Sequence, residues 1–205
     1  MQKQAVPKPA YDREVKLRTA LLLLGGNLPL RRRVPTETLR QALRLLSDPP
    51  GRLVAVSRFY RSPAHPPGAG PDFVNAAAAF DTAEAAPAVL ARLHRIEEAL
   101  GRRRDTGRWG ARVIDIDLLA LGDDVRPNAA GQDRWRALSE SDQQRLTPEE
   151  LILPHPRLQD RAFALVPLAE IAPLWVHPRL GLDVTSMLAR LPSEARAAVQ
   201  PLTCK

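Results

Sequence analysis

The sequence predicts an α+β fold of the ferredoxin-like class, a βαββαβ core in which helices pack on one face of an antiparallel sheet. The first observation is the order of the segments between residues 17 and 119, which reads strand, helix, strand, strand, helix, strand. The second is that Gly and Pro clusters separate these segments, as turns and helix ends do. The third is that this order is the split βαβ arrangement. Apolar segments after residue 160 predict extra C-terminal helices.

The first strand and the first helix follow from a buried run and an amphipathic segment. Residues 17–24 end in a run of leucines that enters the sequence Gly25-Gly26-Asn27, which is typical of a buried strand running into a tight turn. Residues 31–47 carry leucines at helical spacing, with a proline near the start and an Asp-Pro-Pro-Gly sequence after the end. This segment is therefore predicted to be a helix.

The next strands and the second helix are predicted from periodicity and stop signals. Residues 53–60 alternate as one strand would, and residues 62–71 form a loop rich in Pro and Gly. Residues 73–80 are predicted to be a strand, although their alanine run also allows a helix. Residues 87–100 are predicted to be a helix with Pro in its first turn and Gly101 as its stop signal.

The domain organisation is one domain with a tail and an insertion. Residues 1–16 are predicted to be a flexible N-terminal tail, and residues 17–205 a single domain. Residues 123–153 are polar with little periodicity, so we expect an insertion or long loop with a possible helix over residues 133–139. Two short helices are predicted near the C-terminus, over residues 163–171 and 184–191.

Composition excludes several classes of protein. The chain has 205 residues, and its 44% hydrophobic content is enough for a sizeable core. No apolar run approaches the roughly 20 residues that span a membrane, and the N-terminus lacks the apolar region of a signal peptide. The single cysteine, Cys204, allows no disulfide framework. We therefore expect a cytoplasmic protein. We also expect it to be a monomer. Its formal charge of +7 is compatible with nucleic acid, an anionic membrane or small polyphosphates as partners.

The chain is organised around residues 108–119, RWGARVIDIDLL. If this segment is a strand, its period of two places Asp115 and Asp117 on one face and the isoleucines on the other. Two like charges so close repel each other, and a divalent cation would relieve that repulsion. Mg²⁺ favours one or two carboxylates together with substrate phosphates. The alternative is that both aspartates lie on a solvated face of an ordinary strand.

An arginine-rich loop precedes the two aspartates. Its guanidinium groups are donors suited to phosphate oxygens. An indole within such a loop, Trp109, either stacks on a flat ligand or packs inward. The alternative for the whole loop is a solvated basic surface paired with nearby acids. The five arginines are Arg102, Arg103, Arg104, Arg108 and Arg112.

Two further groups of residues are suited to ligands. His155 lies between two prolines, which favour an extended and rigid segment, and Arg157 and Arg161 follow it. Phe73 and Asn75 share a face of their predicted strand, so a ring and a carboxamide there would hold a flat heterocycle. The alternatives are a surface histidine in a proline-bounded turn and an ordinary core phenylalanine.

Six motifs occur together and in order, and with them the chain resembles the 6-hydroxymethyl-7,8-dihydropterin pyrophosphokinase family of folate biosynthesis. The resemblance covers about residues 17–191. It implies a ferredoxin-like fold and transfer of pyrophosphate from ATP to the hydroxymethyl group of a reduced pterin, with release of AMP. The motifs are LLGGNL at 23–28, SRFYRSPA at 57–64, PDFVNAA at 71–77, RIEEALGR at 95–102, RWGARVIDIDLL at 108–119 and LPHPRLQDRAF at 153–163.

The resemblance also implies roles for individual residues. Asp115 and Asp117 match the ligands of two Mg²⁺ ions, and Asp117 is the residue expected to help deprotonate the pterin hydroxyl. The phosphate-contacting arginines correspond to Arg102 and Arg112, which with the two aspartates are the expected catalytic residues. The pterin site is expected to comprise Phe73, Asn75 and Phe163, with backbone groups of Ser62, Pro63 and Ala64. The nucleotide site is expected to comprise Glu97, Arg104, Arg108, Trp109, Leu118, His155 and Arg161.

The sequence departs from the family pattern at two places. Gly26 stands where the family usually has Ser, which is expected to loosen the first turn without removing a catalytic group. The segment 122–154 is longer than the family pattern, so it either alters loop closure beside the nucleotide site or extends into solvent. Loops at 47–53 and 101–108 keep family-like lengths, consistent with lids that close over substrate.

Three other functions are alternatives. An RNA-binding module of the same fold class would carry a characteristic aromatic string on its central strands, and the sequence has none. A metal-dependent nuclease would share the two aspartates but leave the ring and carboxamide unexplained. A relative that has lost its activity would lack chemical groups that this sequence retains. We therefore expect ATP and a reduced pterin as partners, with no nucleic acid and no membrane.

Overall fold

The protein is built on an antiparallel sheet of strands of unequal length. The computed structural model describes residues 16–30, 33–64, 70–102 and 112–203. Strands β5, β1, β4, β3 and β8 are neighbours in that order, and β2 pairs with β4 further along the edge that β3 occupies. The strands are β1 Arg18–Gly26, β2 Arg52–Val56, β3 Tyr60–Ser62, β4 Phe73–Thr82, β5 Asp115–Leu121 and β8 Gln200–Pro201.

The predicted βαββαβ core is confirmed, with one of its strands divided in two. Its helices are α1 Pro35–Leu46 and α2 Ala86–Ala99. The single strand predicted over residues 53–60 is wrong, because β2 ends before Ser57 and β3 begins after it. The Ser57 Oγ accepts the Ala77 amide at 2.9 Å. A side-chain oxygen thus replaces a backbone acceptor and interrupts the regular ladder.

The alanine run of β4 forms a strand that is buried on both faces. Ala76 and Ala78 lie in the core with α1 and α2, whereas Ala77 and Ala79 lie in the core on the opposite face. Successive residues that alternate between the two cores, with a period of two, are the signature of a strand, so the helical alternative is excluded. Small side chains here let helices approach both sides of the sheet.

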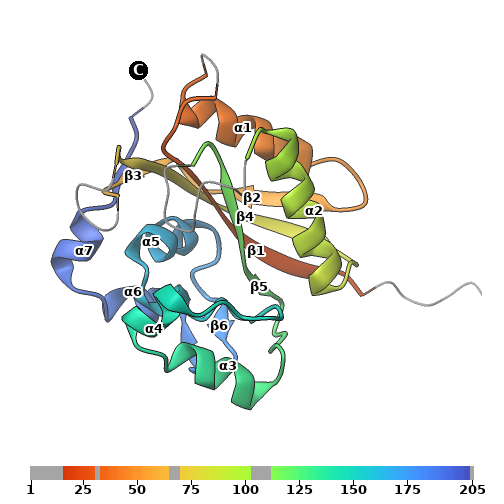
Figure 1. Ribbon diagram of the computed structural model, residues 1–205, viewed down its shortest axis with the longest axis vertical. Coiled ribbons are helices and arrows are strands. Elements are labelled where there is room, and N and C mark those ends of the chain that lie inside the picture. Colours follow the sequence, from red (N-terminus) through yellow and green to blue (C-terminus); the bar gives the residue numbers. More distant parts are fainter. Residues whose placement is uncertain (1–15, 31–32, 65–69, 103–111, 204–205) are drawn as a thin grey trace, which may run out of the picture.

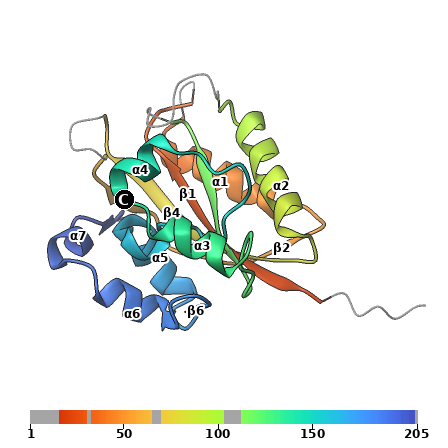
Figure 2. The same cartoon turned by 60° about the horizontal axis from the view of Figure 1, so that its bottom comes forward.

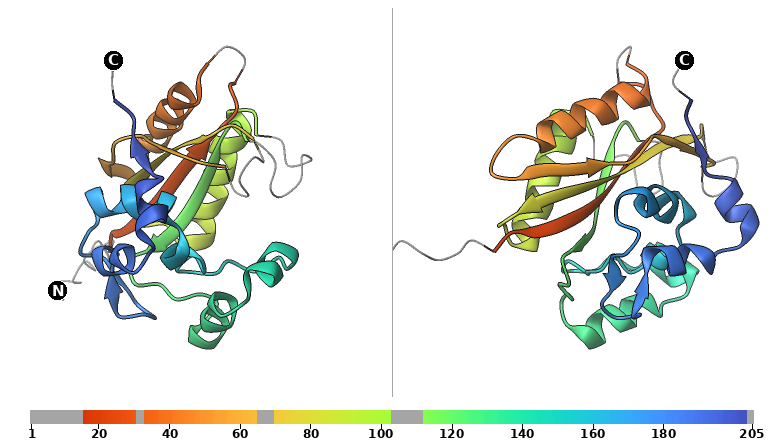
Figure 3. Two further views of the ribbon diagram at one scale, coloured as in Figure 1. Left: turned by 90° about the vertical axis from the view of Figure 1, so that its left-hand side faces the viewer. Right: turned by 180° about the vertical axis from the view of Figure 1, so that it is seen from behind.

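Helices cover both faces of the sheet (Figures 1 and 3). The core helices α1 and α2 pack on one face, as predicted. The predicted C-terminal helices are α5 Ala162–Ile171 and α6 Val184–Ala189, and they pack on the other face. That face carries Leu21 and Leu23 of β1, so it too buries apolar surface. The expectation of helices on one face alone therefore holds only for the core.

The insertion after β5 forms two short helices on the side of the C-terminal helices (Figure 2). They are α3 Ala129–Arg136 and α4 Glu140–Arg145, so the possible helix over residues 133–139 was misplaced. The side chains of Asn128 and Ser139 cap the two helices by accepting backbone amides. The remaining elements are the 3-10 turn η1 Leu158–Asp160, β6 Val176–His177, β7 Leu182–Asp183 and α7 Ser193–Ala197. None of the helices in the described part of the chain could cross a bilayer.

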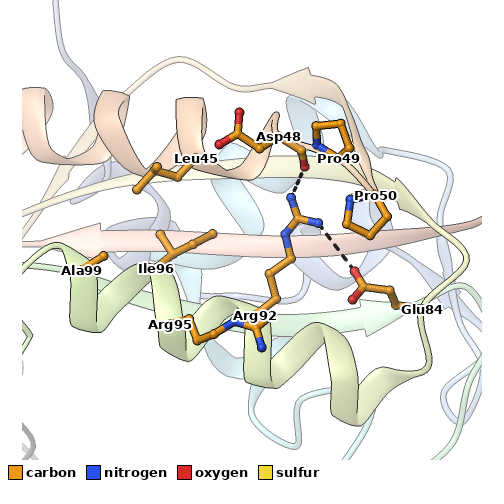
Figure 4. Close-up of a pocket in the computed structure, with 9 residues that line it drawn as sticks. All are labelled: Leu45, Asp48, Pro49, Pro50, Glu84, Arg92, Arg95, Ile96 and Ala99. Atoms are coloured by element: carbon orange, nitrogen blue, oxygen red, sulfur yellow. Dashed lines mark hydrogen bonds and ion pairs between the residues drawn. The ribbon is translucent and has the colours of Figure 1, made fainter.

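A buried arginine joins the middle of α2 to the end of α1 (Figure 4). Arg92 of α2 donates to the backbone carbonyls of Leu46, at 3.3 Å, and Asp48, just beyond α1. Its guanidinium lies 5.1 Å from the centre of the Phe80 ring and 3.7 Å from a Glu84 carboxylate oxygen. These contacts satisfy carbonyls that the end of α1 leaves without intrahelical partners. We therefore assign Arg92 to the fold.

Candidate functional site

The two aspartates lie on the face of β5 predicted from the sequence. Ile116 and Leu118 enter the core on the side of α1 and α2, and Asp115 and Asp117 are partly exposed on the other face. Asp115 is paired in register with Gly25 of β1, which is paired with Asn75 of β4. Asp115 and the carboxamide expected to bind pterin therefore lie in one row across the sheet, and Asp117 lies in the row of Leu23 and Ala77 on the same face.

Asp115 is held by two arginines. Its Oδ1 lies 2.6 Å from Arg102 and its Oδ2 lies 2.5 Å from Arg112. Burial and the negative charge of Asp117 raise the pKa of the Asp115 carboxyl, while the two guanidinium groups oppose that rise. Asp115, Arg102 and Arg112 were expected in one site from the sequence, and the structure places them in contact. Because the negative charge of Asp115 is costly in the free protein, a bound cation or a rearrangement of the arginines would stabilise that charge.

Glu97 lies in the core next to Arg102 and Ile116. Its side chain is completely buried, accepts the Ile116 amide at 2.7 Å and pairs with Arg102. Through those two contacts Glu97 holds both the strand that carries the aspartates and one of the arginines that face them. It was expected in the nucleotide site, and the structure gives its side chain no exposed surface.

The burial of Glu97 predicts a pH-dependent stability. Desolvation is the main cause that raises the Glu97 pKa from 4.5 to about 7, against the opposing effects of the Ile116 amide and Arg102. The folded state therefore holds this proton more tightly than the unfolded state does. The stabilisation is fully present below about pH 4.5 and is lost as the pH rises through about 7. Between pH 5 and 8 we expect the wild type to lose about 2 kcal/mol more unfolding free energy than Glu97→Gln.

Urea unfolding of both proteins at several pH values measures this difference. His177 is buried, and burial lowers its pKa to about 4, so it contributes a slope of opposite sign between about pH 4 and 6.5. Because His177 is present in both proteins, its contribution cancels in the difference. Parallel curves for wild type and Glu97→Gln would show that Glu97 does not titrate in this range.

Asp117 faces the segment that follows the insertion. Its Oδ2 lies 3.5 Å from Arg161, and the same Arg161 nitrogen lies 3.3 Å from the Nε2 of His155. The guanidinium of Arg161 is 5.5 Å from the centre of the Phe163 ring. The Arg161 guanidinium thus contacts both Asp117 and the ring of Phe163, the second residue of α5.

His155 is held as a neutral imidazole. Burial lowers its pKa well below the ordinary value, and the charges of Arg161 and Arg157 act in the same direction. Its Nδ1 accepts the Arg157 amide at 3.1 Å, and its own amide donates to the Leu119 carbonyl at 2.8 Å. The second bond joins the histidine segment to the outer edge of β5, beside the two aspartates.

The expected pterin residues gather on β3 and β4. The Asn75 carboxamide is buried and donates to the Ser62 Oγ at 2.8 Å, which fixes its orientation. Phe73 is partly exposed two residues before Asn75 on the same face. Pro63 is exposed and Ala64 is buried directly after β3, in which Ser62 is paired with Phe73 and Tyr60 with Asn75.

Two residues of the first turn were not recognised as part of the site. The buried Asn27 accepts the Arg112 amide at 2.8 Å and donates to the Pro71 carbonyl at 3.1 Å, so it joins the segments that lead to Asp115 and Phe73. A Cβ at Gly26 would lie 2.6 Å from the Val113 carbonyl oxygen. Glycine therefore allows a close backbone approach there, and the expected loosening of the turn stays a prediction.

Some expected nucleotide residues are placed differently or lie outside the description. The Leu118 side chain is buried on the face opposite Asp117, so only its backbone is oriented towards the site. Arg104, Arg108 and Trp109 fall outside the described residues, as does most of the expected lid at 101–108.

The fold and the site together are those expected of an enzyme that acts on a polyphosphate and a flat ligand. A ferredoxin-like α+β domain carries a carboxylate pair that faces arginines on β5 and, two strands away, a ring and a carboxamide on β4. The comparisons with known proteins give the family. A family model described as 7,8-dihydro-6-hydroxymethylpterin-pyrophosphokinase (HPPK) matches residues 21–173. The chain belongs to this family.

Curated relatives carry the same activity in their names. Proteins called 2-amino-4-hydroxy-6-hydroxymethyldihydropteridine pyrophosphokinase are similar along most of the chain. The protein of Synechocystis is 34% identical and covers 89% of this chain and 80% of its own length. That of Methylorubrum extorquens is 40% identical and covers 75% of this chain and 82% of its own length. The protein is thus an ATP-dependent pyrophosphokinase of folate biosynthesis, which transfers pyrophosphate to 6-hydroxymethyl-7,8-dihydropterin.

Solved structures confirm the fold. The crystal structure of wild-type Plasmodium falciparum HPPK-DHPS has a TM-score of 0.61 to this chain at 16% identity, and the match covers 85% of this chain and 45% of that one. The same wild-type protein with SDX-DHP gives a TM-score of 0.58 at 16% identity, with 84% and 43% covered. This chain therefore matches less than half the length of those solved chains.

Proposed function

We propose that Asp115 and Asp117 together would hold two Mg²⁺ ions, which would offset the negative charge of the ATP triphosphate. The observation that supports this is a pair of carboxylates on one face of β5, each already facing guanidinium groups. Mg²⁺ takes oxygen ligands and commonly completes its octahedron with phosphates and water. Because no group of three or more potential His, Cys, Asp or Glu ligands gathers among residues 16–30, 33–64, 70–102 and 112–203, the substrate would supply the other ligands.

The reaction at this site is an in-line displacement at phosphorus. The hydroxymethyl oxygen of the pterin bonds to the β-phosphorus of ATP, the bond from that phosphorus to the α–β bridging oxygen breaks, and AMP leaves. The hydroxyl proton passes to Asp117. Arg102, Arg112 and Arg161 are the described donors near the aspartates, and they offset negative charge on the phosphate oxygens. Bound Mg²⁺ supplies further polarisation of the phosphoryl oxygens.

The pterin is assigned to the row that begins at Asn75. Its edge would hydrogen-bond to the Asn75 carboxamide, which Ser62 orients, and to the backbone from Ser62 to Ala64. Its faces would pack against the rings of Phe73 and Phe163. This placement brings the hydroxymethyl group towards Asp115 and Asp117 across Gly25.

The nucleotide is assigned to the other end of the same face. His155 and Arg161 contact the phosphates, with Glu97 supporting Arg102 from beneath. Arg104, Arg108, Trp109 and the Leu118 backbone complete the nucleotide site in this proposal. We propose one catalytic domain over residues 17–205 that acts as a cytoplasmic monomer.

Isothermal titration with 6-hydroxymethyl-7,8-dihydropterin tests the proposed ternary site. Titrations of the full chain would be run alone, with α,β-methylene-ATP, and with that analogue plus Mg²⁺. We expect pterin affinity to rise at least about tenfold in the last condition, since metal and nucleotide complete the pocket. Equal pterin affinity in all three conditions would contradict the proposal, and a rise that needs nucleotide but no Mg²⁺ would remove the metal from it.

A further inference from the structure

We propose that the insertion positions the nucleotide site, and that Gln132 of α3 is the residue through which it does so. The proposal rests on the proposed role of His155 and Arg161 in binding ATP. It gives the long segment after β5 a function in this enzyme, in place of an extension into solvent.

Gln132 touches the histidine segment directly. Its side chain is completely buried, and its Nε2 donates to the Pro154 carbonyl at 3.2 Å. Pro154 immediately precedes His155. The start of the insertion holds the same segment, because Arg126 and Leu153 exchange two backbone hydrogen bonds of 2.8 and 3.2 Å. His155 is therefore fixed from the insertion on one side and from the Leu119 carbonyl of β5 on the other.

The segment that Gln132 holds is itself in contact with the proposed site. His155 Nε2 lies 3.3 Å from Arg161, and Arg161 lies 3.5 Å from Asp117. A shift of the Pro154 carbonyl would move the imidazole relative to the β5 edge and change where the Arg161 guanidinium lies. Contacts that depend on such placement lose affinity steeply with small displacements.

Helix α3 is itself anchored. Asp133, next to Gln132, accepts two hydrogen bonds from Arg179, at 2.5 and 3.2 Å, and one from Arg136 at 2.8 Å. Arg179 lies in the turn between β6 and β7, so the insertion is tied to the C-terminal hairpin. Gly131 fits closely against Pro127, where a Cβ would lie 2.7 Å from the Pro127 Cγ. A fixed helix, unlike a loose loop, is able to set the position of the segment it touches.

The test compares Gln132→Met with Gln41→Met. Methionine keeps the length of the side chain and removes the donor to Pro154, and Gln132 Oε1 has no hydrogen-bond partner among the described residues, so one bond is lost. Gln41→Met also removes one carboxamide bond, to Arg33, on α1 across the sheet. The readouts are the KM values for ATP and pterin, kcat, the Tm, and the Kd for Mg²⁺–α,β-methylene-ATP.

We expect Gln132→Met to raise the ATP KM and the analogue Kd roughly three- to tenfold, with the pterin KM and Tm changed no more than in Gln41→Met. Arg179→Gln, a substitution of an exposed residue, is expected to raise the ATP KM about twofold by loosening α3. If Gln132→Met changes neither ATP constant, or weakens both substrates together as the folded fraction falls, Gln132 is structural only. If the wild type releases no AMP, the proposed function fails, while the analogue Kd still decides the role of Gln132.

Discussion

Replacing Asp117 by asparagine is expected to lower kcat for AMP release by roughly 10³-fold or more, with the fold unchanged. The amide keeps the size of the side chain but removes the charge that would bind Mg²⁺ and accept the pterin proton, effects worth several kcal/mol together. Asp115→Asn should act similarly, because Asp115 faces the same space between Arg102 and Arg112. A discontinuous assay that separates AMP from ATP measures the loss.

The matched control is Asp124→Asn. Asp124 lies just beyond the other end of β5 and pairs with Arg18 at 2.9 Å and with Arg126 at 3.7 Å, so the same chemical change removes ion pairs that do not involve Asp115 or Asp117. We expect its kcat to stay within about twofold of the wild type, because partly exposed pairs contribute little. An Asp117→Asn enzyme that retained more than a tenth of the wild-type kcat would remove Asp117 from the chemistry.

Replacing Gly25 by valine is expected to raise the pterin KM at least about 100-fold while leaving nucleotide binding intact. A Cβ at Gly25 would lie 3.0 Å from the Asn75 Oδ1 and 4.0 Å from a Phe73 ring carbon. The additional methyl groups of valine would push the carboxamide off its hydrogen bond to Ser62 and into the space assigned to the pterin. A site built to hydrogen-bond a ligand loses much of its affinity when that donor or acceptor is displaced.

Gly25→Ala provides the graded control for this prediction. Its single methyl requires Asn75 to move by only a few tenths of an ångström, so we expect a rise in pterin KM of about fivefold. The Kd for Mg²⁺–α,β-methylene-ATP should match the wild type in both variants. If the valine variant binds pterin normally, the row from Asp115 through Gly25 to Asn75 is not the pterin site.

The sequence predicted those parts of the fold and the site that depend on local pattern. The period of two over residues 115–118 placed both aspartates on one face, and β5 confirms this because Ile116 and Leu118 fill the core. The order of elements likewise gave the βαββαβ core. These features need only alternation, spacing and turn residues, all of which are visible in one chain.

The features that could not be predicted depend on contacts between distant residues. The break at Ser57 requires the Ala77 amide on another strand. The helical period places Glu97 four residues after Leu93, on the buried face of α2, but the partners that let an acid be buried there, the Ile116 amide and Arg102, are distant in the sequence or lie beyond the helix. Helix α3 lacks a strong apolar stripe, and its position is set by the side-chain cap at Asn128. The packing of α5 and α6 on the second face likewise depends on tertiary contacts, which the local sequence pattern does not show.

Anomalous diffraction from crystals of the full chain grown with Mn²⁺, α,β-methylene-ATP and 6-hydroxymethyl-7,8-dihydropterin tests the central claim most directly. Manganese replaces magnesium at oxygen sites, and its anomalous scattering gives the position of each ion. We expect two peaks, each bound by carboxylate oxygens of Asp115 or Asp117 and by phosphate oxygens, with the pterin against Asn75. A single peak, peaks held by phosphates alone, or a pterin bound away from Asn75 would contradict it.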